Sequence, residues 1–537
     1  MSSLIAVIPI VLLFVLMLAF KMPGYKSALI TLAATVLLAL LAAGPMGMIP
    51  ETLAGRSIWG IVGWSLAEGV WKAIFPILII IIMALYSYNI LLKSGKIEVI
   101  KAQFTSITDD KGIVVLLLVW GFGGLLEGMA GFGTAVAIPA AILIGLGFKP
   151  VFSALVSLIA NTVAVAFGAV GVPVTTLCNE VAAGGAATAE AVMQTSSYIV
   201  IQLGVLFFLV PFMILMITDK KAVWKNLALS VWTGAISFGA QYACARFLGA
   251  ETPAIVGSLA AIIAIILYAR LFKRHTGVAG SSADTRDGDT KDSTGSSAGR
   301  YGLAESLRAW SVYLFILLFI LLSGPLVPGI NRFLNTHLVS RVVLPVTGAT
   351  LIFKWIANAG VMLFLGATLG GLVQGLSLRQ LMVLLAGTVA KSGKTIITIL
   401  SLISISSVMN NSGMIGQIAL GLVALTGSFY PFFAPLIGAV GTFVTGSDTS
   451  ANILFGKLQA NVAGQLGLGA DQTTWLVASN TTGATGGKMI SPQSIAIATA
   501  ACDMEGKDGE ILKAALPYAA IYIVVSGLFV FFGLGLV

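Results

Sequence analysis

The amino-acid sequence predicts an all-α polytopic membrane protein with about 12 transmembrane helices. Of its 537 residues, 58% are hydrophobic and only 9% are charged, whereas soluble domains carry about 25% charged residues. The mean hydropathy is +1.01. Apolar runs long enough to cross a bilayer recur along the whole chain, so a soluble globular domain is excluded.

The apolar runs also predict how the chain is arranged in the membrane. Two apolar regions, 113–148 and 430–464, are interrupted at their centres by glycine and polar residues, which predicts two re-entrant hairpins. Lys96–Thr108 is too polar to span and predicts a helix lying in the interface. Residues 272–307, rich in Gly, Ser, Thr and Asp, predict a disordered linker, and 325–354 allow no assignment. The predicted spans lie near 3–20, 27–44, 72–92, 151–178, 190–217, 224–243, 252–271, 308–323, 356–374, 394–410, 473–501 and 512–534.

An internal repeat is indicated by landmarks that recur in the same order, each at a break in an apolar run. Transporters built from such repeats place the solute near the bilayer midplane, at the repeat interface. If Met414–Gly427 lies in the interface like Lys96–Thr108, the two repeats are inverted, which is what we expect; if it crosses the membrane, they are parallel. Ser94-Gly95 recurs as Ser412-Gly413, Glu127 as Asp448, Asn161-Thr162 as Asn480-Thr481 and Pro173 as Pro492, with shifts of 318, 321, 319 and 319 residues.

The stretch Val477–Ile497 (VASNTTGATGGKMISPQSIAI) is the strongest candidate for a solute site. It begins and ends like a membrane helix, but its middle contains an Asn-Thr-Thr run, three glycines, Lys488 and Pro492. Irregular backbone at membrane depth survives only against protein or a wet cavity, because its polar groups must be paired. The stretch therefore predicts a helix unwound in mid-membrane that offers its free backbone groups to a solute. The alternative is a glycine-rich packing helix with incidental hydroxyls.

Its counterpart in the first repeat, Ala160–Leu177 (ANTVAVAFGAVGVPVTTL), carries no charge. A small monoanion needs one fixed positive charge and several hydroxyl or amide donors, which the two stretches offer together. The alternative for Lys488 is a salt bridge to Glu127 or Asp448 without solute contact. The predicted substrate-binding residues are Asn161, Thr162, Ser447, Thr449, Ser450, Asn452, Asn480, Thr481, Thr482, Lys488, Ser491 and Gln493. The predicted hinge or close-approach positions are Gly128, Gly131, Gly133, Gly168, Gly171, Pro173, Gly483, Gly486, Gly487 and Pro492.

Two acidic residues in the predicted hairpins are candidates for proton coupling. Glu127 lies among glycines in GLLEGMAGFGTAVAIP, and an ionised carboxylate at the bilayer centre costs about 2.5–3.5 kcal/mol. A buried carboxylate without a partner tends to take up a proton. Asp448, in TGSDTSANILF, is the second candidate. The alternatives are that each carboxylate caps a helix N-terminus.

No metal, cofactor or disulfide framework is predicted. Cys178, Cys244 and Cys502 have neither paired nor metal-ligand spacing, and His275 and His337 have no metal or triad companions. The formal charge of +9 is not a nucleic-acid footprint, because the basic residues lie between apolar stretches.

Five stretches are close to signatures of the bacterial L-lactate permease family: LLEGMAGFGTAVAIP, GLGFKP, NTVAVAFGAVGVP, TGSDTSANILF and NTTGATGGKMISPQSIAIA. This resemblance covers nearly all of both repeats. It implies a multi-pass protein of the bacterial cytoplasmic membrane that carries L-lactate, D-lactate or glycolate together with H⁺. The Asn-Thr motifs also resemble those of the wider ion-transporter superfamily, whose members have inverted repeats, two re-entrant hairpins and elevator-type motion. The chain departs from the family pattern in its short loop before residue 356 and in its linker, so a monomer and a homodimer both remain open.

The resemblance also implies a division of the chain. In the first half, residues 1–71 are expected to form N-terminal scaffold helices, 72–189 the first repeat with hairpin 113–148 and broken helix 151–178, and 190–271 further scaffold helices. Residues 272–307 are expected to form a cytoplasmic linker. In the second half, 308–393 are expected to form scaffold helices, 394–501 the second repeat with hairpin 430–464 and broken helix 473–501, and 502–537 a C-terminal helix.

Three other readings compete with H⁺-coupled transport. Carbonyl-rich helix breaks also suit Na⁺, so a Na⁺-coupled carrier of another small carboxylate is the main alternative. An intramembrane enzyme would need a nucleophile and base or metal ligands, which the cysteines and histidines do not supply, so we expect no enzyme. A channel is disfavoured by buried ionisable groups inside paired broken helices.

The charge distribution generates a topology prediction. With residues 21–26 on one side, 22 of the 30 Lys and Arg residues share that side and six lie on the other, so the rich side is cytoplasmic and both termini are external. Cysteines introduced at Ser282 and Val537 should therefore react with an impermeant reagent from opposite sides of intact cells. Equal labelling of both positions would overturn this topology.

Overall fold

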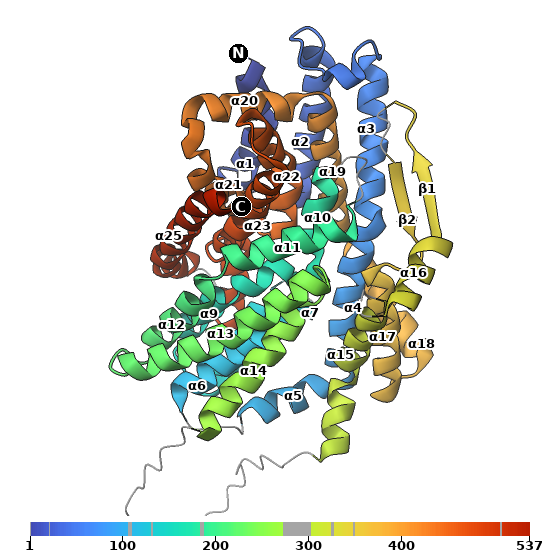
Figure 1. Cartoon of the computed structure of the whole chain (residues 1–537). Helices are drawn as coiled ribbons and strands as arrows, with labels where there is room; N and C mark the ends of the chain where they lie inside the picture. Colours follow the sequence, from blue (N-terminus) through green and yellow to red (C-terminus); the bar gives the residue numbers. More distant parts are fainter. Residues whose placement is uncertain are drawn as a thin grey trace, which may run out of the picture.

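The computed structural model describes residues 2–20, 22–105, 110–129, 131, 133–182, 187–271, 302–323, 327–346, 350–504 and 507–537, which are almost entirely helical (Figure 1). The first half contains α1 (Ser2–Leu18), α2 (Gly24–Leu38), α3 (Ile58–Lys72), α4 (Ile79–Ser94), α5 (Lys96–Thr105), α6 (Lys111–Leu116), α7 (Gly123–Met129), α8 (Thr134–Gly145), α9 (Pro150–Ala160), α10 (Gly168–Val181), α11 (Ala189–Gln202), α12 (Leu206–Thr218), α13 (Val223–Phe247) and α14 (Pro253–Leu271). The second half contains α15 (Leu303–Ser323), α16 (Pro328–His337), β1 (Val339–Val343), β2 (Thr350–Lys354), α17 (Ala359–Val373), α18 (Leu378–Lys391), α19 (Gly393–Asn411), α20 (Met414–Thr426), α21 (Tyr430–Thr445), α22 (Asp448–Gln465), α23 (Ala470–Lys488), α24 (Pro492–Ala501) and α25 (Asp508–Gly533).

The number of membrane crossings is bounded by the length and composition of these helices. Within the described ranges, eight helices are long and apolar enough to cross, or nine if α11 and α12, bent by 43°, form one broken span. One of the eight, Met414–Phe443, combines α20 and α21, which are separated at Gly427 (φ 53°). The chain is thus a polytopic membrane protein, while the predicted number of twelve spans stays a prediction.

The sequence analysis missed one helix and misplaced one boundary. α3 (Ile58–Lys72) precedes the span predicted at 72–92, and a break at Phe75 (φ −121°, ψ 115°) lies between α3 and α4. Phe75 precedes Pro76, and the residue before a proline is driven out of the helical region. The linker predicted to end at 307 lies outside the described residues up to 301. However, α15 begins at Leu303, and Glu305 in its first turn forms a salt bridge with Lys96 at 2.5 Å.

One pair of landmarks of the internal repeat has matching local structure. Gly95 (φ 69°) and Gly413 (φ 79°) are both left-handed residues that join a long helix to a short one. Helix contacts recur as well: α2 packs on α19 as α17 packs on α4, and α1 packs on α20 as α15 packs on α5. Figure 1 shows α5 and α20 at opposite ends of the molecule.

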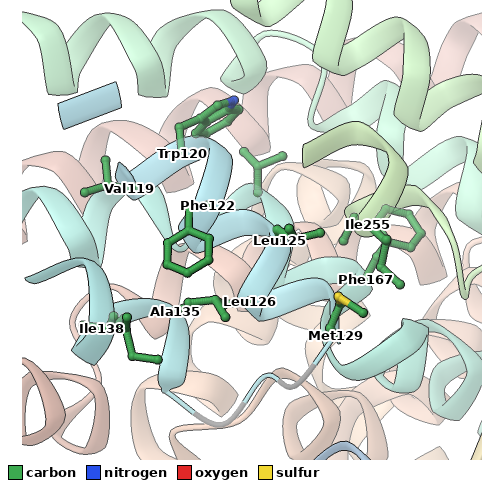
Figure 2. Packing of buried hydrophobic residues seen from close by; sticks show 14 of the residues in the cluster. Val119, Trp120, Phe122, Leu125, Leu126, Met129, Ala135, Ile138, Phe167 and Ile255 are labelled. Atoms are coloured by element: carbon green, nitrogen blue, oxygen red, sulfur yellow. The ribbon is translucent and has the colours of Figure 1, made fainter. Parts of the chain in front are cut away.

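The two ranges predicted as hairpins each contain helices joined by a short connection. The first range holds α6, a π-helical stretch Leu117–Phe122, α7 and α8, and the second holds α21 and α22. Apolar side chains from the first range pack against Phe167 and against Ile255 of α14 (Figure 2). Burial of these side chains positions α7, and with it Glu127, in the interior of the protein.

A two-stranded sheet fills the region for which the sequence allowed no assignment. β1 and β2 are antiparallel, with Val339 opposite Lys354 and Val343 opposite Thr350. Phe353 of β2 lies against Trp71 of α3, with ring centroids 4.2 Å apart. The aromatic contact holds the sheet beside the break between α3 and α4.

Glycines allow α21 and α23 to pack with their backbones in contact. A Cβ atom at Gly483 would lie 1.7 Å from the carbonyl oxygen of Pro435, and one at Gly487 would lie 2.1 Å from that of Ala439. Gly438 on the facing helix is equally confined, because its Cβ would lie 2.0 Å from the carbonyl oxygen of Asn480. Small residues at such interfaces are how membrane helices approach closely.

We expect Gly483→Ala to destabilise the protein by about 1–3 kcal/mol or more, because the added methyl group overpacks a rigid backbone contact. Gly464→Ala is the matched control: Gly464 is also helical, and nothing lies within 4 Å of its Cβ position. The thermal midpoint in detergent should fall for the first variant and hold or rise for the second. An equal midpoint for both would contradict the close contact.

Candidate solute and proton site

A buried salt bridge joins the two halves of the chain. Nζ of Lys488, the last residue of α23, lies 3.0 Å from Oε1 of Glu127 on α7, and the two side chains are only 11% and 3% exposed. The alternative interpretation of Lys488, a salt bridge to Glu127, is therefore observed in this structure. Removing either partner of such a pair leaves the other charge buried and uncompensated, which is strongly destabilising.

The backbone beside Glu127 is unusual. At the start of α10, Ala169, Val170 and Gly171 all adopt left-handed conformations, with φ of 44°, 58° and 74°. A Cβ atom at Gly168 would lie 2.8 Å from Oε1 of Glu127, so this glycine makes room for the carboxylate. Left-handed non-glycine residues cost on the order of 1–3 kcal/mol each and concentrate at functional sites.

Asp448 is a second buried carboxylate close to this pair. It is 2% exposed, it interacts electrostatically with Lys488 and Glu127, and neither carboxylate oxygen has a hydrogen-bond partner among the described residues. The alternative that Asp448 caps its helix is wrong, since Ser447 is the N-cap of α22 and accepts a hydrogen bond from the Ser450 N–H at 3.3 Å. Asp448 is in the first helical turn, where the dipole favours negative charge.

Glu127 is not a helix cap either. It lies inside α7, after four residues of that helix, and its Oε1 atom is occupied by Lys488. Its Oε2 atom has no partner in the part of the chain that the structure describes. The site therefore presents free acceptor atoms on both carboxylates beside one shared cation.

Asn161 contributes open hydrogen-bonding capacity from the first repeat. It ends α9 at the predicted break, it is 4% exposed, and neither its amide nitrogen nor its amide oxygen has a partner within the described ranges. Its neighbour Thr162 instead donates to the Ile159 carbonyl at 2.9 Å. Tyr522 of α25, which the sequence analysis missed, interacts with Asp448 and Thr162 and shares a hydrogen bond with Thr485 at 2.7 Å.

The Asn-Thr-Thr run of α23 is not unwound. Asn480, Thr481 and Thr482 lie in a continuous helix that breaks only after Lys488, so the prediction of irregular backbone at this run is wrong. Their side chains bind other helices: Asn480 donates to Oδ1 of Asn452 at 2.8 Å, and Thr482 donates to Oε1 of Gln202 at 2.8 Å. Thr482 also donates to the carbonyl oxygen of Ala478, four residues back in its own helix, at 3.4 Å.

Asn452 links this run to the first repeat. Its amide nitrogen donates to Oγ1 of Thr481 at 2.8 Å and to the carbonyl oxygen of Pro173 at 3.1 Å. That carbonyl belongs to α10, two residues beyond its left-handed stretch. Asn452, Asn480 and Thr481 thus hold the site elements together through protein partners.

The other predicted substrate-binding residues contact protein atoms or are exposed. Ser491 donates to Oγ of Ser494 at 2.9 Å, Gln493 is exposed and lies against Gly446, and Thr449 is buried beside Asp448 in α22. Most of the predicted glycines mark close packing: Cβ atoms at Gly128, Gly131, Gly133, Gly171 and Gly486 would approach Ala254, Ala169, Ile497, Ala250 and Tyr522, respectively.

A second cluster of buried charges escaped the sequence analysis. Glu68 and Lys72 of α3 form a salt bridge at 2.6 Å, and Glu180 of α10 and Lys457 of α22 form another at 3.2 Å. The missed signal was the spacing of Glu68 and Lys72, four residues apart and therefore on one face of a helix. Among the described residues, no group of three or more His, Cys, Asp or Glu side chains could hold a metal ion.

The apolar helices long enough to span a bilayer, together with the buried ion pairs, define a polytopic membrane protein with internal polar contacts. Comparison with known proteins is more specific, since residues 2–537 match the model of the L-lactate permease family. The chain therefore belongs to this family, which confirms the resemblance, and the family points to a transporter rather than an enzyme.

Individual relatives agree with this assignment. The L-lactate permease of Streptococcus iniae is 38% identical over 87% of this chain and 92% of its own length. The glycolate permease GlcA of Escherichia coli K12 is 33% identical over 98% of this chain and 95% of its own. Among solved structures, the efflux pump MtrF of Neisseria gonorrhoeae resembles the chain in fold alone, with 13% identity, a TM-score of 0.50 and coverage of 95% and 94% of the two chains.

We expect Lys488→Met to destabilise the folded protein by about 3–5 kcal/mol at neutral pH, because Glu127 is left buried without its cation. The double variant Glu127→Gln/Lys488→Met removes both charges and should recover most of this loss. Thermal unfolding in detergent measures both, with Gln at the exposed Arg379 as the charge-loss control. If Lys488→Met unfolds at the same temperature as the control, the salt bridge is not the stabilising contact.

Proposed function

We propose that the chain is a secondary active transporter that imports L-lactate, and also D-lactate or glycolate, by H⁺ symport across the bacterial cytoplasmic membrane. Family membership supports the solute class, because the relatives named above are lactate and glycolate permeases. The observation that carries the coupling is the buried Lys488–Glu127 salt bridge.

This salt bridge supplies a simple exchange of partners. When Glu127 binds a proton, it no longer neutralises Lys488, and the cation becomes available to the carboxylate of the solute. The proton and the monoanion then enter together, and the charge of the buried site is the same before and after binding. Either one alone would leave an uncompensated charge in a low-dielectric interior, which is strongly disfavoured.

The other polar atoms without hydrogen-bond partners match the hydroxyl and carboxylate groups of a 2-hydroxymonocarboxylate. Asn161 has a free donor and a free acceptor, and Asp448 has two free oxygens. A carboxylate accepts hydrogen bonds, and a hydroxyl both donates and accepts. Asp448 is also the second candidate for carrying a proton, since it is a buried carboxylate with no direct partner among the described side chains.

We further propose that the two repeats are inverted and that the site moves with them in an elevator-type cycle. The matched contacts of α2 with α19 and of α17 with α4, and the positions of α5 and α20, support the inversion. Under this proposal α7–α10 and α21–α24 form the moving part, with 113–148 and 430–464 as re-entrant hairpins.

The first test is uptake of labelled L-lactate into proteoliposomes under an imposed pH gradient. The wild-type protein should concentrate lactate, whereas Glu127→Gln should lose accumulation and retain lactate exchange, because the amide cannot carry the proton. Glu190→Gln, at an exposed position, is the matched control. Accumulation driven by a Na⁺ gradient alone would replace this proposal with a Na⁺-coupled carrier, to which the free oxygens of Asp448 and Asn161 are also suited.

The second measurement is lactate affinity. Lys488→Gln keeps a hydrogen-bond donor but removes the charge, so losing one charge-assisted contact of about 1.5–3 kcal/mol should raise the dissociation constant roughly 10- to 150-fold. A neutral solute of similar shape should lose far less. Unchanged lactate affinity in a folded Lys488→Gln protein would assign Lys488 a purely structural role.

A further inference from the structure

Helix α14 packs closely against α7, the helix that carries Glu127. A Cβ atom at Gly124 would lie 2.6 Å from Oγ of Ser258, and one at Gly128 would lie 3.0 Å from Cβ of Ala254. Non-bonded carbon atoms are best separated by about 3.5–4.0 Å, so a side chain at either glycine would be overpacked. Gly124 and Gly128 lie on the two sides of Glu127 in α7. The backbone around this carboxylate is therefore held against α14.

The turn that precedes α14 contacts a second element beside Glu127, the left-handed start of α10. A Cβ atom at Gly171 would lie 2.2 Å from the carbonyl oxygen of Ala250, which is fully buried. Gly168, the first residue of α10, makes room for Oε1 of Glu127. α14 also packs on the 3-10 helix Val163–Phe167, which leads into α10. The two backbone elements that adjoin Glu127 thus share the support of α14 and its preceding turn.

α13 is joined to α14 and to the first predicted hairpin. Nε1 of Trp232 in α13 donates to the carbonyl oxygen of Ala264 in α14 at 2.9 Å. At its beginning, α13 reaches the hairpin, because Lys225 forms a salt bridge with Asp110, the N-cap of α6. These two side chains are 42% and 33% exposed, and exposed ion pairs contribute only about 0–1 kcal/mol. The attachment of the α13–α14 pair to the hairpin therefore depends mainly on the close packing of α14.

The glycine contact also opposes sliding of α14 along α7. Trp120 lies about one turn before Gly124, and α7 ends one residue after Gly128. A shift of one turn, about 5.4 Å, would either place the indole of Trp120 opposite Ser258 or carry Ala254 past the end of α7. Packed interfaces change between discrete arrangements and do not deform continuously. We therefore expect α7 and α14 to keep their relative position when the protein changes conformation.

We propose that α13 and α14 move together with the candidate site as one rigid body, relative to α2, α4, α17 and α19. The proposal rests on the transport function and the elevator-type cycle proposed above. It adds residues 223–271 to the moving part, in place of the scaffold role that the family resemblance implies for 190–271. In this arrangement Glu127 keeps the same backbone support throughout the transport cycle.

A disulfide between α7 and α14 tests whether the two helices move together. Cβ of a cysteine at Gly124 would lie 3.5 Å from Cβ of residue 258, within the range of about 3.5–4.5 Å that a disulfide needs. In a background with Cys178, Cys244 and Cys502 replaced by alanine, G124C/S258C should take up lactate equally fast when oxidised and when reduced, because the bond joins parts that do not separate. Mass spectrometry verifies the cross-link. Loss of uptake on oxidation, restored by a reductant, would place α14 outside the moving body.

Distances between spin labels measure the motion directly and remain informative if G124C/S258C fails to fold. Ile263 of α14, Leu436 of α21 and Leu37 of α2 are 64%, 42% and 56% exposed and can carry labels. Between lactate-free protein and protein with lactate at low pH, the 263–37 distance should shift, whereas the 263–436 distance should stay fixed. A shift of the 263–436 distance, or an unchanged 263–37 distance in protein that transports lactate, would overturn the inference. If the wild-type protein itself moves no lactate, it is the proposed function that fails.

Discussion

The folded chain depends on a single constraint: ionised groups that leave water inside a membrane protein must be neutralised by a partner. Lys488 and Glu127 meet this constraint together, at 3.0 Å and almost fully buried, although 361 residues separate them in the chain. Their contact requires α23 to reach α7, which the backbone packing of α23 on α21 at Gly483 and Gly487 and the apolar packing around α7 make possible. Neither half of the chain could bury its own charged residue alone, so the ion pair helps to determine how the repeats assemble.

The same constraint explains why polar residues that resemble solute ligands are mostly used by the protein itself. Asn452, Asn480 and Thr481 satisfy one another and the Pro173 carbonyl, and buried networks of this kind are stable only when every member is paired. The atoms left open are then informative. They belong to Asp448, Asn161 and Oε2 of Glu127. These are the atoms to which the proposed function assigns the solute and the proton.

The sequence predicted the class of protein and singled out Lys488 and Glu127, which form a salt bridge in the structure, because composition and isolated charges in apolar runs are local properties. The prediction failed where contacts with distant parts of the chain determine the local structure. Asn480–Thr482 resembles a helix break, but partners on α22 and α11 keep it helical. Ser447 rather than Asp448 is the helix cap, a choice between neighbouring residues that no pattern resolves. Glu68 lies before the predicted span 72–92, and Lys72 lies at its first residue. The residues from Ile58 to Lys72 are diluted by glycine and charge, so α3 was missed.

Charge neutrality also links the two polar clusters of the protein. At the candidate site, the proposed binding of one proton together with one monoanion leaves the total charge unchanged. Binding of the solute therefore adds no net charge to the protein interior. The second cluster is neutral as well, because Glu68 pairs with Lys72 and Glu180 pairs with Lys457. An unbalanced charge in a low-dielectric interior would cost several kcal/mol. In both clusters, therefore, the protein keeps charged side chains in its interior without burying a net charge.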